Sequence, residues 1–351
     1  MAAALPHLVA RLRAAAFVGA AVAASSLDAA DRAPAGLHVE YRGAVSLPDK
    51  VAAAGAEPLP LTGLSGVTWL GRDRYIAVLD NSASVVQFHL ELAPDGTPRA
   101  ASGFEPVAVA ERHDYEDVAP RVGGVPALFL CEEDTPAIRV FRLADGAAEG
   151  TIPLPAVVRS RRPNRGLEAL ALDPDGRHLW TANEEALIPD GGPAAPGVGT
   201  VVRLMRLPLQ TDGPPFQAAY RVDPPHDFVP VFAGPRLSGV VALVALGQGR
   251  MLVLERSGGP GLPPFESRLY LVDTATAVDV SRIGSDLAGR PETIVDKTRI
   301  WSSAVGLNLE GLCLGPSLGD DRRALVGISD NGGLATPTQA LGFELSAVTS
   351  P

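Results

Sequence analysis

The stretch NRGLEALALDPDGRHLWTANEE, residues Asn164–Glu185, decides the fold. Its centre, Asp173-Pro174-Asp175-Gly176, has the signature of a type I turn, because proline presets φ at the second position and glycine follows at the fourth. The flanking segments 167–172 and 178–182 are short, largely apolar and bounded by turn residues, which favours strands over helices. The stretch therefore predicts two antiparallel strands joined by a tight turn and followed by acids.

The same pattern occurs five times: a small-residue corner, an apolar strand, a turn, a second apolar strand and a carboxylate. The copies begin at Gly63, Asp114, Asn164, Arg236 and Leu307, so successive starts are 51, 50, 72 and 71 residues apart. A third segment of strand character follows each copy, and further strand candidates lie between the copies. Units of three or four antiparallel strands that repeat about every 40 to 50 residues are typical of β-propeller blades.

The repeat therefore predicts an all-β protein of the β-propeller class. Five blades are defined by the copies, and a sixth is expected, because the two longer gaps have room for a degenerate blade; loop insertions are the alternative. Segment 38–45 also has strand character, and we expect it to complete the last blade beside the C-terminal strand and so close the ring. No composition shift or charged linker divides the chain, so residues 31–351 are interpreted as a single propeller domain.

The first 30 residues are interpreted as a signal peptide and short leader. Arg11 and Arg13 precede an apolar run of 11 residues, 14–24, no acid occurs before Asp28, and Ala21-Val22-Ala23 offers a small-residue cleavage site. This pattern predicts a secreted or periplasmic protein, with import into an organelle as the alternative. The run is too short to cross a bilayer, and no later stretch reaches the roughly 20 apolar residues that a membrane helix needs.

The charge of the chain limits its partners. A net charge of −10 argues against nucleic acid, because neutralising phosphates requires a basic surface. Almost all of the positive charge is arginine, and the densest group is Arg159, Arg161, Arg162 and Arg165. Guanidinium groups suit phosphate and carboxylate, so Arg162 and Arg165 are candidates for binding a small anionic substrate. The alternative is a solvated loop.

Acids recur at two places in the copies. Glu116, Glu168 and Glu310 follow the first corner, and a second set follows the second strand: Asp80, Glu132, Glu184, Glu255 and Asp330. Equivalent positions of a propeller lie at equal radius and height, so these acids are expected to surround one end of the central channel. Carboxylates held close together repel one another unless cations compensate, and calcium accepts six to eight oxygen ligands. The candidate calcium ligands are Asp80, Glu116, Glu132, Glu184 and Asp330.

A recurring acid can also cap a turn by accepting backbone N–H hydrogen bonds, without any metal. This alternative stays open, since turns select for aspartate and asparagine. Two cysteines, Cys131 and Cys313, lie in apolar strands and are interpreted as unpaired buried thiols, with a disulfide as the alternative.

Three separate motifs resemble the phytase-like family of exported proteins, which is described as having an esterase-like activity related to phytase. They are NRGLEALALDPDGRHLWTANEEAL, LSGVVAL followed by GRMLVLERSGG, and NLEGLCLG followed by ALVGISDNGG. The motifs occur in the family's order, and the likeness extends from about Gly63 to Phe343. The resemblance implies a β-propeller that hydrolyses phosphoesters or other esters.

The resemblance also points to particular residues. The glutamate of the family's EGL-type corner corresponds to Glu168 and Glu310, and the family's ER pair corresponds to Glu255-Arg256, so these four are the candidate catalytic residues. The first and fourth corners depart from the pattern, because they carry Ser65 and Ser238 in place of glutamate.

The leading hypothesis is a metal-assisted hydrolase with calcium on an acidic channel face and arginines that hold an anionic substrate. The alternatives are a non-catalytic propeller that binds a ligand or a protein, and a calcium-dependent propeller of the lactonase type. A GxSxG motif is absent, which argues against the nucleophile elbow of an α/β-hydrolase. No histidine is spaced to pair with the serine of either LSG corner, so a seryl nucleophile is disfavoured.

Overall fold

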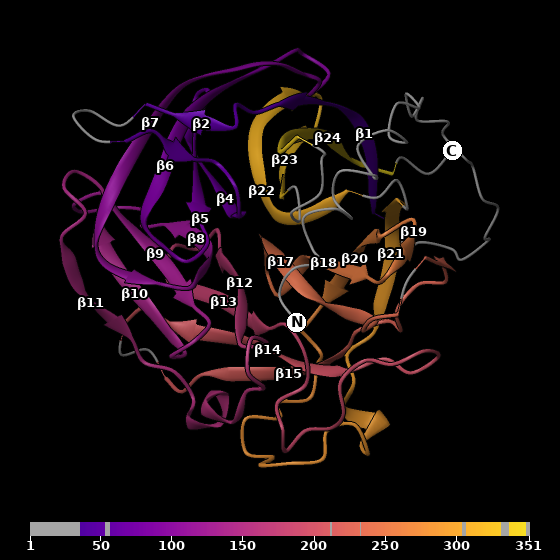
Figure 1. Cartoon of the computed structure of the whole chain (residues 1–351). Helices are drawn as coiled ribbons and strands as arrows, with labels where there is room; N and C mark the ends of the chain where they lie inside the picture. The colour runs from indigo at the N-terminus through magenta and orange to yellow at the C-terminus, as the bar shows by residue number, and fades with distance from the viewer. Residues whose placement is uncertain are drawn as a thin grey trace, which may run out of the picture.

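The computed structural model describes residues 36–52, 57–210, 213–231, 233–303, 307–330 and 337–348. The predicted signal peptide and leader, residues 1–30, lie outside these ranges. Within them, five four-stranded sheets surround a central axis, so the chain is a five-bladed β-propeller (Figure 1). The described residues contain no α-helix and only two short 3-10 turns, η1 (Ala156–Ser160) and η2 (Pro291–Thr293).

Each blade is an antiparallel sheet whose strands follow one another from the channel to the perimeter. Blade 1 comprises β4 (Leu64–Gly71), β5 (Arg74–Leu79), β6 (Ser82–Leu92) and β7 (Pro98–His113). Blade 2 comprises β8 (Tyr115–Pro120), β9 (Ala127–Glu132), β10 (Ala137–Arg142) and β11 (Ala148–Ile152). Blade 3 comprises β12 (Leu167–Leu172), β13 (His178–Asn183), β14 (Val201–Pro208) and β15 (Phe216–Arg221). Blade 4 comprises β17 (Leu237–Gly247), β18 (Arg250–Gly258), β20 (Phe265–Asp273) and β21 (Lys297–Ser303).

Blade 5 closes the ring by combining the two ends of the described chain. Its inner three strands are β22 (Asn308–Gly319), β23 (Arg322–Asp330) and β24 (Gln339–Ala347), and its outermost strand is β1 (Leu37–Ser46). The register places Leu37 opposite Ala347 and Ser46 opposite Gln339. The predicted pairing of segment 38–45 with the C-terminal strand is confirmed.

The two long gaps between copies contain loops and not a sixth blade. Two two-stranded ribbons complete the described sheets: β2 (Lys50–Val51) with β3 (Leu59–Pro60), and β16 (Val229–Pro230) with β19 (Gly261–Leu262). The loop 274–296 follows β20 and contains η2. The innermost strands contact one another in the order β4, β8, β12, β17, β22 and back to β4, so five blades complete the ring.

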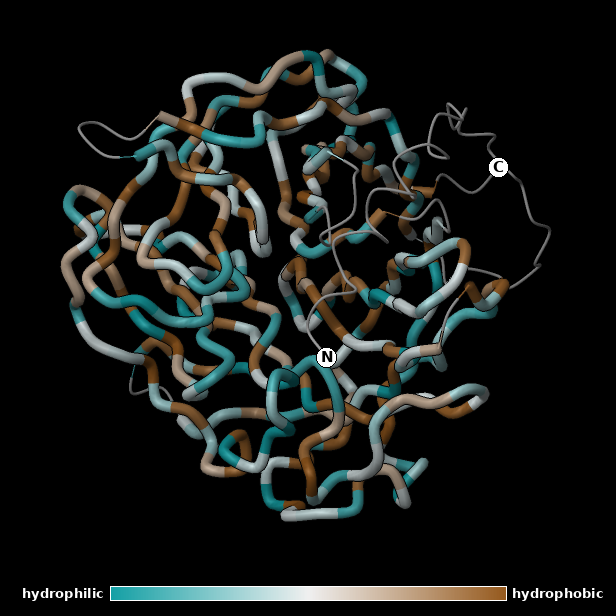
Figure 2. The backbone as a smooth tube through the Cα atoms, in the orientation of Figure 1, coloured by the Kyte–Doolittle hydropathy of each residue, from teal (hydrophilic) through white to brown (hydrophobic). Residues whose placement is uncertain are grey.

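The hydrophobic core is divided among the interfaces between blades. Each of the five larger clusters of buried apolar side chains joins one blade to the next, as Trp180 and Tyr220 of blade 3 do with Tyr270 of blade 4. Apolar residues are accordingly spread around the whole ring (Figure 2). Burial on both faces explains why the second strands are apolar without alternation.

Two further sequence-based expectations concern the cysteines and the membrane. Both cysteines are free thiols, as expected; Cys131 is buried as expected, whereas Cys313 is only half-buried. None of the helical turns in the described ranges is long and apolar enough to cross a bilayer.

Candidate active site

The innermost strand of every blade contains a β-bulge near its start. The change of register falls at Ser65-Gly66 in blade 1 and at single residues in the other four blades: Glu116, Glu168, Val241 and Glu310. A bulge adds one unpaired residue and redirects its side chain. Three of the bulges therefore present the predicted corner glutamates at the same end of the channel.

A second set of equivalent positions follows from the same register. The residue preceding each bulge pairs with Leu79, Glu132, Asn183, Glu255 or Ser329 on the second strand. The next residue along the second strand is then Asp80, Glu133, Glu184, Arg256 or Asp330. Contacts between blades support this equivalence, because Gly63 N–H donates to Asp330 Oδ1 (2.9 Å) and Gly166 N–H donates to Glu133 Oε1 (2.8 Å).

In each set, the residues of four blades line one cavity of about 180 Å³ at this end of the channel, and the exceptions are Val241 and Glu184. Six acids and two arginines contribute to its lining, together with Gly63, Leu64, Ser65 and Asn164: Asp80, Glu116, Glu133, Glu168, Glu310, Asp330, Arg165 and Arg256. Seven of these eight charged residues were predicted from the sequence as site residues. The structure brings them together from all five blades.

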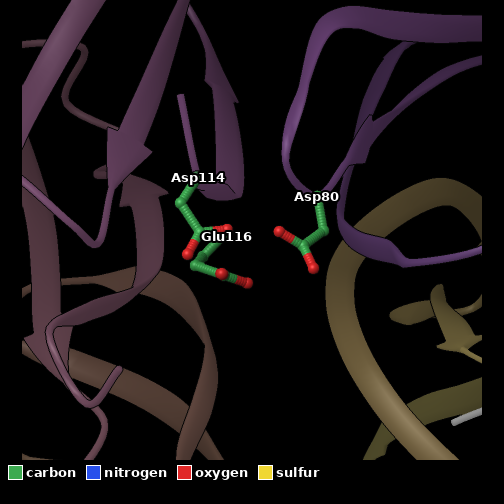
Figure 3. Close-up of side chains that lie close together, drawn as sticks. All are labelled: Asp80, Asp114 and Glu116. Atoms are coloured by element: carbon green, nitrogen blue, oxygen red, sulfur yellow. The ribbon is translucent and has the colours of Figure 1, made fainter. Parts of the chain in front are cut away.

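Asp80, Asp114 and Glu116, here called the aspartate cluster, face one another across the junction of blades 1 and 2 (Figure 3). Each offers a carboxylate oxygen, and these oxygens lie within 4.8 Å of one another. Ser65 Oγ donates to Glu116 Oε2 (3.0 Å), and Asn81 Nδ2 donates to Asp80 Oδ1 (2.6 Å). Asp114 is 6% exposed, and its Oδ1 is buried without a hydrogen-bond partner.

Glu133, Glu168 and Glu184, here called the glutamate cluster, form a second group whose carboxylate oxygens also lie within 4.8 Å of one another. Both oxygens of Glu184 bind arginines: Arg256 donates to Oε1 (3.0 Å) and Arg165 donates to Oε2 (2.7 Å). Arg256 also donates to Glu310 Oε1 and to Asn308 Oδ1, so it links blades 3, 4 and 5.

Burial and mutual repulsion raise the pKa values of several acids of the cavity. Burial, followed by the hydrogen bond and the charge of Asp114, raises the pKa of Asp80 to about 8. Burial raises the pKa of Glu133 to about 7. The pKa values of Glu116 and Glu168 lie well above the usual range, again mainly through burial and then through neighbouring acids. Bound cations would relieve this repulsion.

Three predicted acids are not among the residues that line the cavity: Glu132, Glu184 and Glu255. Glu184 instead binds the two arginines of the lining, Arg165 and Arg256. Glu132 is fully buried between blades 1 and 2, where it pairs with His113 (2.9 Å) and Arg139 (2.7 Å). Glu255 is fully buried between blades 3 and 4, where Lys297 (2.6 Å) and Tyr220 (2.6 Å) bind it. Successive strand residues point to opposite faces, so the cavity positions fall one residue later, at Glu133 and Arg256.

Arg162 and Ser238 also depart from the sequence-based expectations. Arg162 donates to the carbonyl of Gly191 (2.7 Å) and is not among the residues that line the cavity. Ser238 pairs with Ser257, and the bulge of blade 4 falls instead at Val241. Serine therefore replaces the corner glutamate only in blade 1, while blade 4 has valine.

Sequence reasoning overlooked Asp114 and Glu133. Asp114 occupies the position held by Gly63, Gly166 and Asn308 in three other blades, so the repeat gives no signal for an acid there. Glu132 was predicted in place of Glu133, because either of these adjacent glutamates can be aligned with the acids that follow the second strand in the other copies. The acid-rich segments DYED (114–117) and EED (132–134) were the available signal.

The aspartate cluster fits a hard divalent cation. Three carboxylates converge from two blades, and the unpartnered, buried Asp114 Oδ1 is an oxygen that a cation would satisfy. Asn81, which contacts Asp80, is a neutral amide beside the cluster.

Comparison with known proteins gives the following relationships. An aldose sugar dehydrogenase from Streptomyces coelicolor, solved with PQQ bound, has 13% identity and a TM-score of 0.41 over 89% of this chain and 99% of its own. A luciferin-regenerating enzyme has 11% identity and a TM-score of 0.38 over 82% of this chain and 92% of its own. No curated protein matches the sequence.

The model of the phytase-like family, described as "esterase-like activity of phytase", matches residues 59–333, which include every residue that lines the cavity. The match covers more than half of the chain and agrees with the three motifs, and the chain therefore belongs to the phytase-like family.

Proposed function

We propose that the protein is a metal-assisted hydrolase of phosphoesters or related esters, and that the cavity at the end of the channel is its active site. The observation that carries this proposal is the lining of that cavity, where two arginines stand among six acids. Family membership supports an esterase-like activity.

Arg165 and Arg256 would bind the anionic part of the substrate. Both line the cavity, and their side chains are 22% and 15% exposed, so each presents N–H groups to the cavity while its ion pairs hold it in place. Guanidinium groups bind phosphate and carboxylate oxygens through paired N–H donors. Glu310 would position Arg256 through their ion pair.

Glu168 would accept a proton from the attacking water. It is 7% exposed at the bulge of β12, and its pKa is well above the usual range because of burial and then the charges of Glu116 and Glu184. A carboxylate of raised pKa is a stronger base, which suits it to general base catalysis near neutral pH.

Asp80, Asp114 and Glu116 would hold calcium, with Asp330 and Glu133 as the next acids of the lining. When bound, calcium would supply positive charge that offsets the acids and stabilises the developing charge on an ester oxygen. Export through the predicted signal peptide is part of this proposal, since extracellular calcium is abundant enough for weak sites.

The test combines calcium titration with an activity screen. Metal-stripped protein is titrated with calcium in a calorimeter and then assayed on phosphomonoesters, phytate and lactones with and without calcium. We expect calcium-dependent hydrolysis of an anionic ester, and Glu168→Gln should reduce kcat by about 10²–10⁴-fold if it removes the general base. The exposed Glu91→Gln is the matched control and should match wild type.

Three results would change the assignment. Hydrolysis of lactones alone would favour the lactonase-type alternative, in which the arginines do not bind substrate. Calcium binding without hydrolysis of any ester would favour a non-catalytic binding propeller. An activity that is insensitive both to calcium and to Glu168→Gln would refute the proposed mechanism.

A further inference from the structure

Arg256 interrupts a ring of acids. The strand register gives it the position held in the other blades by Asp80, Glu133, Glu184 and Asp330. One of five equivalent positions at the mouth of the channel thus carries a fixed positive charge where the repeat otherwise places a negative one. Blade 4 also lacks the bulge glutamate, since Val241 occupies that position.

The guanidinium of Arg256 binds ligands that a metal ion would otherwise take. It donates to Glu184 Oε1 (3.0 Å), to Glu310 Oε1 and to Asn308 Oδ1 (3.2 Å), so two carboxylates and an amide oxygen from neighbouring blades converge on it. Carboxylate and amide oxygens are the ligands that calcium prefers. Only 15% of the Arg256 side chain is exposed, so the charge is held within the cavity wall.

The glutamate cluster is already engaged by these and other donors. Arg165 binds the second oxygen of Glu184, and Gly166 N–H donates to Glu133 Oε1. A cation entering this cluster would have to displace a guanidinium and would also experience its repulsion. Like charges held a few ångströms apart in a partly buried site repel strongly, because little solvent screens them.

The aspartate cluster is not bound by a cationic side chain from the described part of the chain, and it keeps a carboxylate oxygen without a hydrogen-bond partner. Among the described residues no arginine or lysine forms an ion pair with Asp80, Asp114 or Glu116. The Asp114 carboxylate lies close to the other two carboxylates (Figure 3), and its buried Oδ1 has no hydrogen-bond partner. One cluster is therefore open to a cation, while Arg165 and Arg256 both bind the other.

We propose that the Arg256 guanidinium takes the place of a second metal ion, so that the cavity binds one divalent cation at the aspartate cluster and the glutamate cluster becomes a second site once that charge is removed. This inference rests on the proposed function, because it requires that the cavity bind a cation. Beyond the proposed function, the inference specifies how many ions bind, which cluster holds them, and that Arg256 sets their number.

The number of calcium ions bound per chain tests the inference without reference to activity. Metal-stripped full-length protein is titrated with calcium chloride by calorimetry, and equilibrium dialysis with radioactive calcium gives an independent count. Wild type should bind one ion, and Asp114→Asn should weaken that binding at least tenfold. Arg256→Met should bind two ions. Arg256→Lys, which keeps the charge, should bind one.

Location is tested by combining variants. Arg256→Met with Glu184→Gln should return to one ion, because the second site has lost a ligand. Glu184→Gln alone should keep the single ion of wild type. This last variant still tests the inference if Arg256→Met does not fold, since loss of the ion would show that the glutamate cluster is the wild-type site.

The outcomes separate this inference from the proposed function. One ion in wild type and one in a folded Arg256→Met protein would overturn the inference and leave a one-calcium hydrolase intact. Two ions in wild type would overturn it as well. No calcium binding by wild type would overturn both the inference and the calcium role in the proposed function.

Discussion

Asp117 shows how a single side chain holds the bulges of two blades together. It follows Glu116 in the chain and is 1% exposed, and its carboxylate accepts hydrogen bonds from Val118 N–H (2.8 Å) and from Leu170 N–H (2.7 Å) of blade 3. Burial raises its pKa well above the usual range, although both N–H donors oppose that shift. Glycine at position 66 leaves the space that this carboxylate fills.

Replacing Gly66 should therefore destabilise the junction of blades 1 and 2. A Cβ at this position would lie 2.0 Å from Asp117 Oδ1 and 2.4 Å from Asp117 Cα, so backbone would have to move. We expect Gly66→Ala to lower the free energy of unfolding by about 1–3 kcal/mol, as overpacking does elsewhere. Urea denaturation measures the change.

Gly192→Ala is the matched control for this substitution, because a Cβ there has no atom within 4 Å. Its unfolding midpoint should stay close to that of wild type. Equal midpoints for the two alanine variants would contradict the close approach of Gly66 to Asp117.

At the scale of elements, the strand register decides which acids reach the cavity. Sequence reasoning identified the strand pairs and the corner glutamates Glu168 and Glu310, since both follow from local periodicity and turn residues. It placed Glu132 and Glu255 one residue away from the cavity positions. Which of two adjacent residues faces the channel depends on the pairing partner across a bulge, and a single strand's sequence does not contain that information.

The loop 274–296 is attached to blade 3 by a buried charge. Arg203 on β14 makes two hydrogen bonds of 2.7 Å with Asp190, and both residues are fully buried. The same guanidinium donates to the carbonyls of Val280 (3.3 Å) and Ile283 (2.8 Å) in the loop. One arginine thus secures the long insertion that follows β20.

Arg203→Met should destabilise the protein strongly, because Asp190 would remain buried without its partner. Loss of one member of a buried pair costs about 3–5 kcal/mol, and we expect a fall in unfolding free energy of that order. Thermal and urea denaturation measure it. Arg142→Met, which removes an exposed ion pair with Asp145, should change the free energy of unfolding little.

Adding Asp190→Leu to Arg203→Met should recover stability. A further loss would contradict the explanation that the single variant is destabilised by a buried, unpaired Asp190.

At the scale of the whole molecule, the ring could be predicted from sequence because the repeat itself encodes it. Five copies of one strand pair require five similar sheets, and each sheet buries both faces only against its neighbours. The expected sixth blade was wrong, since the described residues form five four-stranded sheets. Insertions such as 274–296 lengthen the spacing between copies as an extra blade would, and length alone does not distinguish the two.

Concentrating acids at one end of the ring should make the metal-free protein sensitive to pH. The folded pKa values of Asp80, about 8, and Glu133, about 7, are above their ordinary values. A raised folded pKa means that the native state binds protons more tightly than the unfolded chain, so this stabilisation is present at low pH and is lost as pH rises.

The unfolding free energy of metal-stripped protein should consequently decrease between about pH 5 and pH 9. Saturating calcium should reduce the decrease, because the bound ion compensates the ionised carboxylates. Urea titrations at several pH values, with chelator or with calcium, provide the measurement. Asp80→Asn should flatten the metal-free profile, and a metal-free profile that rises with pH would contradict the assigned shifts.

The closure of the ring by β1 and β24 has a mechanical consequence. These strands are antiparallel, and Leu37 lies opposite Ala347 at one end of the pair. A pulling force applied through these two residues would act across the strands, along the direction of the hydrogen bonds between them. The bonds would then be loaded one pair at a time, as in a zipper, from Leu37 toward Ser46. The propeller should open at this seam under a small force, with its other four blades still folded.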